Sequence, residues 1–190
     1  MPWNFPILLT WLRILIIPIF TLLFYLPADW ISDRQIINWL AAGFFAIAAI
    51  TDWFDGYLAR RWKQTSNFGA FLDPVADKLM VAVALILLVA TGRTYAIFAM
   101  IIIGREITIS ALREWMAQLG KRNSVAVAKL GKFKTAAQMG AIFLLLLTSP
   151  PLAEPNLLWK LGNILMLIAC ILTIWSMLYY LKMATKEFKS

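Results

Sequence analysis

The stretch from Asp52 to Lys78 reads DWFDGYLARRWKQTSNFGAFLDPVADK and holds four of the chain's ten acidic residues. Asp52 and Asp55 are three residues apart, and Asp73 and Asp77 are four apart, so each pair lies on one face of a helix. The first pair closes an apolar run, and the second pair opens another. Because only the short polar connection 61–67 separates them, we expect two antiparallel helices that bring the four carboxylates together.

Four carboxylates in a partly dry pocket require a positive partner. A single charged side chain inside a membrane costs roughly 2.5–3.5 kcal/mol on insertion scales, and like charges favour protonation of one another. A divalent cation removes both difficulties, and oxygen ligands favour Mg²⁺, Mn²⁺ or Ca²⁺ over zinc. The alternative interpretation is that these acids cap helix ends or mark topology.

The composition is that of an integral membrane protein. The 190 residues are 62% hydrophobic and 15% charged, and the mean hydropathy is +0.75. At this length we expect one domain, residues 1–190. The absence of His excludes Ser-His-Asp and Cys-His chemistry, and the single Cys170 excludes an internal disulfide. We expect no removable signal peptide, because the first apolar run contains Arg13 and lacks a small-residue cleavage site.

Apolar runs near the length needed to cross a bilayer predict an all-α bundle of six transmembrane helices with an interfacial N-terminal segment. The predicted spans are 7–26, 35–60, 73–91, 94–118, 135–147 and 156–181. Pro74 is expected in the first turn of the third span. The fifth helix is expected to begin within the basic segment 119–134. Tyr179 and Tyr180 are expected to anchor the last span at the interface.

The distribution of basic residues predicts the orientation in the membrane. Six spans place both termini on one side, where we count twelve Lys and Arg residues, and the other side has three: Arg34, Arg93 and Lys160. The positive-inside rule therefore places the termini, the aspartates and the basic segment in the cytoplasm. The net charge of +8 then points to membrane topology and anionic head groups, and no nucleic-acid partner is expected. Arg13 lies within the first span and is a functional candidate, unless it extends to the interface.

The pattern D-x2-D-G-x2-A-R-x8-G-x3-D-x3-D, from Asp52 to Asp77, resembles the signature of the CDP-alcohol phosphotransferases at every fixed position. These are membrane enzymes of phospholipid synthesis. The resemblance implies two Mg²⁺ or Mn²⁺ ions held by the acidic residues of the motif. It also implies that Asp77 acts as the general base on the acceptor hydroxyl. The implied metal ligands are Asp52, Asp55, Asp73 and Asp77.

The resemblance also implies a site for the CDP part of the donor. The matching residues are Gly56, Ala59, Arg60, Ser66 and Gly69. Gly56 has no side chain, which permits a close approach of the nucleotide, and Arg60 suits phosphate oxygens. The alternative for Gly56 is simple helix packing.

The motif does not identify the acceptor, because enzymes with many different acceptors share it. Arg105 and Arg113 are about two helical turns apart and share a face. With Lys132 and Lys134 they are predicted to form a cationic pocket for a phosphorylated acceptor. The alternative is that the lysines only set the topology.

Three outer motifs resemble the bacterial phosphatidylglycerophosphate synthases within this family. They are Asn4-x-Pro6-x2-Leu9-Thr10-x2-Arg13, Arg105-Glu106-x4-Ala111-Leu112-Arg113-Glu114-Trp115 and Gly131-Lys132-x-Lys134-Thr135-x2-Gln138. They make Asn4, Thr10 and Arg13 possible accessory residues. The implied reaction transfers phosphatidyl from CDP-diacylglycerol to sn-glycerol 3-phosphate, by a homodimer in the bacterial inner membrane.

Two alternatives stay open. One is the same chemistry with another acceptor, such as inositol phosphate or phosphatidylglycerol. The other is a six-span cation transporter that uses the aspartates as its ion site. Transporters usually place that site near the middle of the membrane, whereas these aspartates lie near one interface.

Overall fold

The computed structural model describes residues 5–27, 29–31, 33–62, 67–118, 128–149 and 156–187. Within these ranges the chain forms helices and no strand. The helices are α1 (Phe5–Leu23), α2 (Arg34–Trp62), α3 (Asn67–Ala90), α4 (Ala96–Gln118), α5 (Ala128–Leu147) and α6 (Leu157–Glu187). The predicted all-α fold of six helices is confirmed. The predicted interfacial segment lies largely outside the described residues, since the description begins at residue 5.

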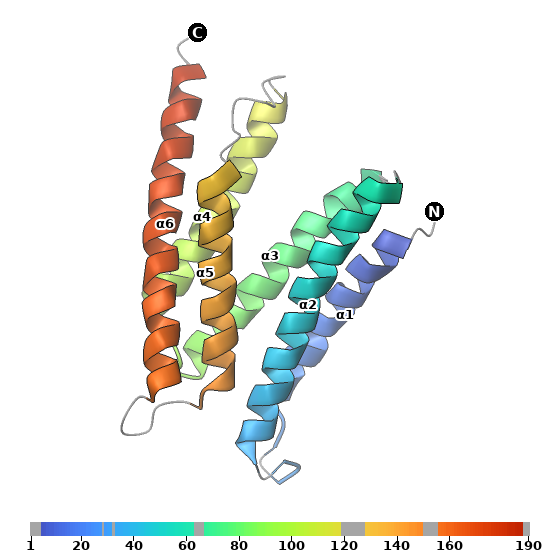
Figure 1. Cartoon of the computed structure of the whole chain (residues 1–190), viewed down its shortest axis with the longest axis vertical. Coiled ribbons are helices and arrows are strands. Elements are labelled where there is room, and N and C mark those ends of the chain that lie inside the picture. The colour runs from blue at the N-terminus through green and yellow to red at the C-terminus, as the bar shows by residue number, and fades with distance from the viewer. Residues whose placement is uncertain are drawn as a thin grey trace.

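The helices form two groups that α3 joins (Figure 1). α1 packs against α2 and α3, while α5 packs against α6 and α4 also packs against α6. α3 contacts α4 and α5 as well, and α2 meets α5. The two groups diverge toward the end of the molecule where both termini lie (Figure 1). The end of α2 and the start of α3 lie there, as do the end of α4 and the start of α5, and we call this the termini end.

One predicted boundary is wrong. α3 begins at Asn67, so Pro74 lies inside the helix and not in its first turn. A proline removes one backbone hydrogen bond, but the turns on either side continue when their side chains pack against neighbouring helices. The extra turns extend the helix beyond Asp73 toward the termini end. The expected early start of the fifth helix, within the basic segment, is confirmed at Ala128.

Residues at the helix ends explain where α2 begins and where α3 stops. Asp33 accepts a hydrogen bond from the backbone N–H of Gln35 at 2.8 Å and so caps α2. At the end of α3, Gly92 has φ of 68°. The N–H of Arg93 donates to the carbonyl of Leu88 at 2.8 Å. This is a glycine-terminated helix end, and it turns the chain directly into α4.

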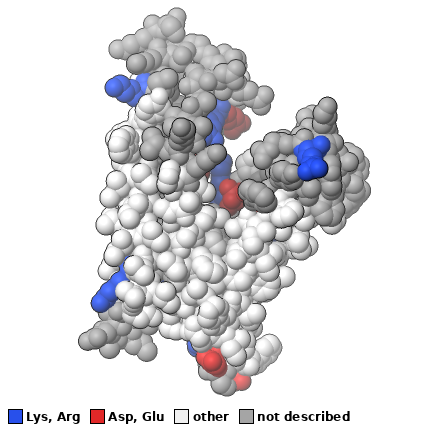
Figure 2. Space-filling model, in the orientation of Figure 1, with Lys and Arg blue, Asp and Glu red and all other residues white. Residues whose placement is uncertain are grey.

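The surface has the character of a membrane protein. Large apolar side chains face outward along the helices, as on α1 at Leu8, Leu12, Leu15, Ile19 and Leu22. Two helical stretches are long and apolar enough to cross a membrane, Arg34–Asp52 and Leu157–Lys182. Shorter apolar stretches occur at Leu8–Leu23 and Phe133–Leu147. Figure 2 shows that the middle of this face is largely uncharged and that charged side chains lie at the two ends and in a hollow between the two helix groups. An apolar surface this extensive is consistent with a helix bundle that lies in a membrane.

α5 and α6 pack tightly against each other at Gly162. A Cβ atom placed on Gly162 would lie 2.7 Å from Cγ of Leu145, and Leu145 is fully buried. The absent side chain of Gly162 therefore sets the distance between the two helices.

We expect Gly162→Ala to lower the thermal unfolding midpoint, because overpacking a core costs about 1–3 kcal/mol. The measurement is a thermal melt of the purified protein in a neutral detergent. Gly43→Ala in α2 is the matched control, because nothing lies within 4 Å of a Cβ added there, and alanine is the better helix former. Equal midpoints for Gly162→Ala and the wild type would contradict this account of the α5–α6 contact.

Candidate active site

The acidic motif lies on two helices that meet at the termini end. Asp52 and Asp55 lie on α2, and Asp73 and Asp77 lie on α3. Asp52 precedes the last residue of α2 by ten positions, and Asp77 follows the first residue of α3 by ten positions. At 1.5 Å per residue, both aspartates lie about 15 Å from the end of their helix. The antiparallel pair therefore brings Asp52 and Asp77 to the same depth.

Arg13 lies between the two helices at this depth. Its Nη1 donates to Oδ1 of Asp52 at 2.7 Å. Arg13 is 1% exposed, whereas the side chain of Asp52 is 43% exposed. Arg13 and Asp77 also line one small cavity between α1, α2, α3 and α5. Arg13 is thus a buried cation at the acidic motif, and the alternative that it extends to the interface is wrong.

Asp77 faces charges from three other helices. The carboxylates of Asp52 and Glu106 are close enough to repel Asp77, and the guanidinium of Arg13 is close enough to attract it. Thr10 precedes Arg13 by one helical turn and is also buried. α1, α2, α3 and α4 therefore all contribute charged groups around Asp77.

Several predicted residues are placed only in part. The backbone of six of them lies in helices, but their burial and their contacts are not described: Asp55, Gly56, Ala59, Arg60, Asp73 and Lys132. Asn4 and Ser66 lie outside the described residues. Gly69 is buried in the first turn of α3. Among the side chains that the structure does describe, no group of three acids or thiols is close enough to hold a metal ion. Two of the motif's four aspartates, Asp55 and Asp73, are not among these described side chains.

A second charged cluster lies between α4, α5 and α6. Arg105 is buried on α4 and donates to Oε1 of Glu106 at 3.0 Å. Lys134 is buried on α5 and donates to the same oxygen atom. Nη2 of Arg105 also reaches Oγ of Ser176 on α6, at 3.4 Å. One carboxylate thus neutralises two buried cations only in part, which suits the cluster to a phosphate group.

Tyr180 on α6 holds the remaining arginine of this cluster. The Tyr180 hydroxyl accepts a hydrogen bond from Nη2 of Arg113 at 3.2 Å. The guanidinium groups of Arg105 and Arg113 lie 5.7 Å and 5.5 Å from the centre of its ring. Tyr180 is 4% exposed, so the prediction that it anchors the helix at the interface is wrong. Three of the four predicted cationic residues are therefore brought together: Arg105, Arg113 and Lys134.

The acidic motif and the cationic cluster are connected through α3 and α4. Lys78, next to Asp77, donates a hydrogen bond to Oγ of Ser110. Ser110 in turn donates to the backbone carbonyl of Glu106 at 2.5 Å. A ligand in the cationic cluster would therefore lie one helix away from the carboxylate of Asp77.

Sequence reasoning missed Glu106, Lys78, Ser110, Ser176 and Tyr180 as parts of the site. Glu106 carried a signal, because an acid inside a span requires a partner. Lys78 carried the same signal as a charge inside the predicted span 73–91, whereas the serines and the tyrosine carried none, since such residues in apolar helices have many packing roles. Only the neighbouring helices reveal their contacts.

The residues present fit a divalent cation bound by oxygen atoms. Asp52 and Asp77 converge from facing helices, Asp52 is open to solvent, and the chain has no His. Carboxylates without nitrogen or sulfur ligands are typical of Mg²⁺ and Mn²⁺ sites. The arrangement is therefore suited to hold a cation beside a phosphate-binding pocket.

Comparison with known proteins identifies the family. Residues 3–175 match the family model of the CDP-alcohol phosphatidyltransferases. Three relatives share the name CDP-diacylglycerol--glycerol-3-phosphate 3-phosphatidyltransferase. The protein of Pectobacterium atrosepticum is 53% identical over 189 residues, 98% of each chain. That of Haemophilus influenzae is 51% identical over 193 residues, 97% of this chain and 95% of its own. That of Escherichia coli (strain K12) is 50% identical over 190 residues, 98% of each chain.

The agreement extends over nearly the whole length of both chains and includes the helices that carry both charged clusters. This chain belongs to the CDP-alcohol phosphatidyltransferase family.

Proposed function

We propose that this protein transfers the phosphatidyl group from CDP-diacylglycerol to sn-glycerol 3-phosphate, which yields phosphatidylglycerophosphate and CMP. The proposal is supported by relatives of that name that are 50–53% identical over almost the full chain. The buried cluster of Arg105 and Lys134 around Glu106 is the observation that supports a phosphorylated acceptor. A neutral alcohol acceptor has no need of such a cluster, whereas a phosphorylated one does.

The chemistry is an in-line displacement at phosphorus. Asp77 accepts the proton of the acceptor hydroxyl, whose oxygen forms a bond to the β-phosphorus of the donor. The bond between that phosphorus and the bridging oxygen breaks, and CMP leaves. Asp52, Asp55, Asp73 and Asp77 would hold two Mg²⁺ or Mn²⁺ ions, which, when bound, stabilise the charge that develops on the diphosphate. The family is generally dependent on a divalent metal.

The donor and the acceptor have separate binding residues in this proposal. Gly56, Ala59, Arg60, Ser66 and Gly69 bind the CDP part of the donor. Arg105, Arg113, Lys132 and Lys134 bind the phosphate of the acceptor. Thr10, Arg13 and Asn4 support the site, and the ion pair of Arg13 with Asp52 is consistent with a positioning role for Arg13. The link from Lys78 to Ser110 supports a short path between the two binding regions.

The proposal includes a cellular setting. We infer a single domain over residues 1–190 whose six helices cross the bacterial inner membrane, with the termini and the active site in the cytoplasm. The excess of basic residues at the termini end supports this orientation. The family resemblance also leads us to propose a homodimer.

The experiment that tests the function is acceptor profiling. Purified protein is incubated with CDP-diacylglycerol, Mg²⁺ and radiolabelled acceptors, and lipid product and CMP are measured. We expect product with glycerol 3-phosphate at a rate at least about tenfold above that with inositol phosphate or phosphatidylglycerol. The cationic cluster suits a phosphomonoester over the phosphodiester of phosphatidylglycerol, and the relatives at 50–53% identity are named for glycerol 3-phosphate and not for inositol phosphate. We also expect EDTA to abolish product and added Mg²⁺ or Mn²⁺ to restore it.

Other outcomes would contradict parts of the proposal. A preference for inositol phosphate or phosphatidylglycerol would contradict glycerol 3-phosphate as the acceptor but would still agree with the proposed displacement at phosphorus. Full activity in EDTA would reject the metal. Metal uptake into vesicles without any release of CMP would favour the transporter.

A further inference from the structure

A second pocket lies at the opposite end of the molecule from the aspartates. It has a volume of about 390 Å³ and is lined by Phe24, Arg34, Ile37, Asn38, Thr91, Arg93 and Ser149. These residues come from the segment after α1, the start of α2, the α3–α4 turn and the segment after α5. The proposed reaction uses none of them.

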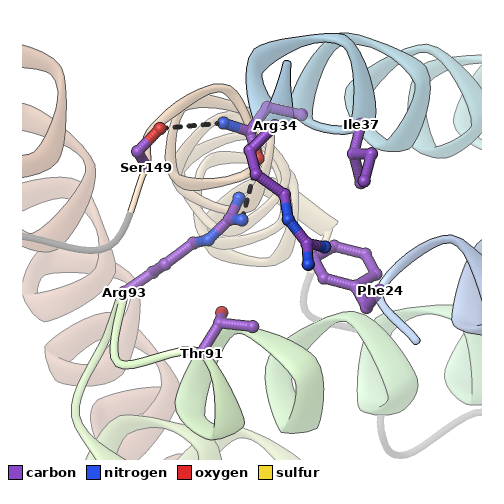
Figure 3. A pocket seen from close by; sticks show the side chains of 7 residues that line it. Phe24, Arg34, Ile37, Thr91, Arg93 and Ser149 are labelled. Carbon is purple, nitrogen blue, oxygen red and sulfur yellow. Dashed lines mark hydrogen bonds between the residues drawn. The ribbon is translucent and has the colours of Figure 1, made fainter. Parts of the chain in front are cut away.

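Two arginines extend into this pocket from different elements. Figure 3 shows the side chains of Arg34, on α2, and Arg93, on the α3–α4 turn, directed toward the same space, with Phe24 and Thr91 beside it. Arg93 is 5% exposed, and its guanidinium lies 5.4 Å from the centre of the Phe24 ring. Arg34 is exposed. Two cations that share a pocket repel each other unless an anion lies between them.

Carbonyl and amide groups neutralise this charge only in part. Arg93 donates to the carbonyl of Leu146 at 2.9 Å and to Oδ1 of Asn38 at 2.8 Å. Arg34 donates to the carbonyl of Leu26 at 3.4 Å. In the part of the chain that the structure describes, neither arginine forms an ion pair with a carboxylate. The end of α5 supplies roughly half a negative charge, which balances the charge of the buried Arg93 only in part.

Arg93 also has an unsatisfied donor. Its Nε is buried and has no hydrogen-bond partner among the described residues. Burial lowers the pKa of Arg93 to about 10, so the guanidinium is still charged at neutral pH. A buried cation without a compensating anion is unfavourable unless a ligand supplies one.

We propose that this pocket binds the phosphate of an anionic membrane phospholipid. The volume is within the usual range for small-ligand pockets. Phe24 and Ile37 provide apolar walls for the glycerol part. The side chains of Tyr25 and Trp30, on the same end of the molecule, are 72% and 77% exposed, as aromatic residues at a membrane interface commonly are. A lipid in the leaflet at this end can therefore place its head group in the pocket while its acyl chains stay in the membrane.

The test is a thermal melt in neutral detergent with short-chain phosphatidylglycerol, short-chain phosphatidylcholine or inorganic phosphate. With phosphatidylglycerol at about one hundred times its dissociation constant, we expect the wild-type midpoint to rise by roughly 5 °C or more. We expect less than half that rise with phosphatidylcholine or phosphate. Arg34→Gln removes one charge from an exposed position, so it should fold and lose at least half of the rise. Arg93→Lys, which keeps the charge but loses the forked donor, should lose part of it.

The matched control is Lys160→Gln, which removes an exposed charge near the start of α6 at the same end of the molecule. It should keep the full rise. Binding at the aspartates would affect wild type and Arg34→Gln equally, so an equal rise in these two would overturn the proposal. A full rise with inorganic phosphate would assign the pocket to a free anion, and a full rise with phosphatidylcholine would show that charge is not what is recognised. Each of these results rejects the anionic lipid.

Discussion

Asp77→Asn is expected to reduce CMP release to at most about a thousandth of the wild-type rate. Asparagine has nearly the same size and shape as aspartate, but it cannot take the proton of the acceptor hydroxyl and is a poor metal ligand. The carboxylate of Asp77 lies near Asp52, Arg13 and Glu106. Of the two described acids, Asp52 is paired with Arg13, and Glu106 is paired with Arg105 and Lys134. The measurement is release of labelled CMP under saturating donor, acceptor and Mg²⁺.

The control for this variant is Asp33→Asn at the opposite end of the molecule. Asp33 caps α2, and asparagine caps a helix as well as aspartate does, so turnover and unfolding midpoint should stay near those of the wild type. Asp77→Asn should also keep binding of CDP-diacylglycerol within a few-fold, which separates lost chemistry from lost structure. Near-normal turnover in Asp77→Asn would remove Asp77 from the role of general base.

Lys134→Gln is expected to raise the KM for glycerol 3-phosphate by roughly 10- to 100-fold, because charge-assisted hydrogen bonds contribute about 1.5–3 kcal/mol. Lys134 is buried beside Glu106, and Arg105 still pairs with Glu106 after the substitution. The fold is therefore expected to survive. The KM for CDP-diacylglycerol should change little, because in our proposal the two substrates bind to different sets of residues. The measurement is steady-state kinetics with each substrate varied in turn.

Two comparisons decide between a binding role and a structural role for Lys134. Lys182→Gln removes an exposed charge from α6 toward the same end of the molecule and should leave both KM values unchanged. Lys134→Arg should recover part of the acceptor affinity, since it retains the charge. A lower unfolding midpoint with an unchanged KM for glycerol 3-phosphate would mean that Lys134 serves only to pair with Glu106.

Two predictions failed, those for Pro74 and Tyr180, and the interfacial alternative for Arg13 is also wrong. Pro74 appeared to start a helix, Arg13 had an alternative as an interfacial residue, and Tyr180 appeared to be an interfacial anchor. In the structure Pro74 is internal to α3, and Arg13 and Tyr180 are buried. For Arg13 and Tyr180 a contact with another helix outweighed the local preference, whereas Pro74 is exposed and the helix continues before it. Arg13 meets Asp52 from 39 residues away, and Tyr180 meets Arg113 from 67 residues away. Local sequence contains no information about such partners.

The class of fold, the number of helices and the acidic motif could all be predicted from the amino-acid sequence. These depend on the length of apolar runs and on residue spacing along one helix, which are local properties. The packing of the helices was needed to reveal that Arg13 pairs with Asp52 and lines a cavity with Asp77. It was also needed to reveal that Glu106 joins Arg105 to Lys134 and that Arg34 and Arg93 share a pocket at the far end. Each of these depends on which faces of distant helices meet, because buried charges find their partners through packing and not through proximity in the chain.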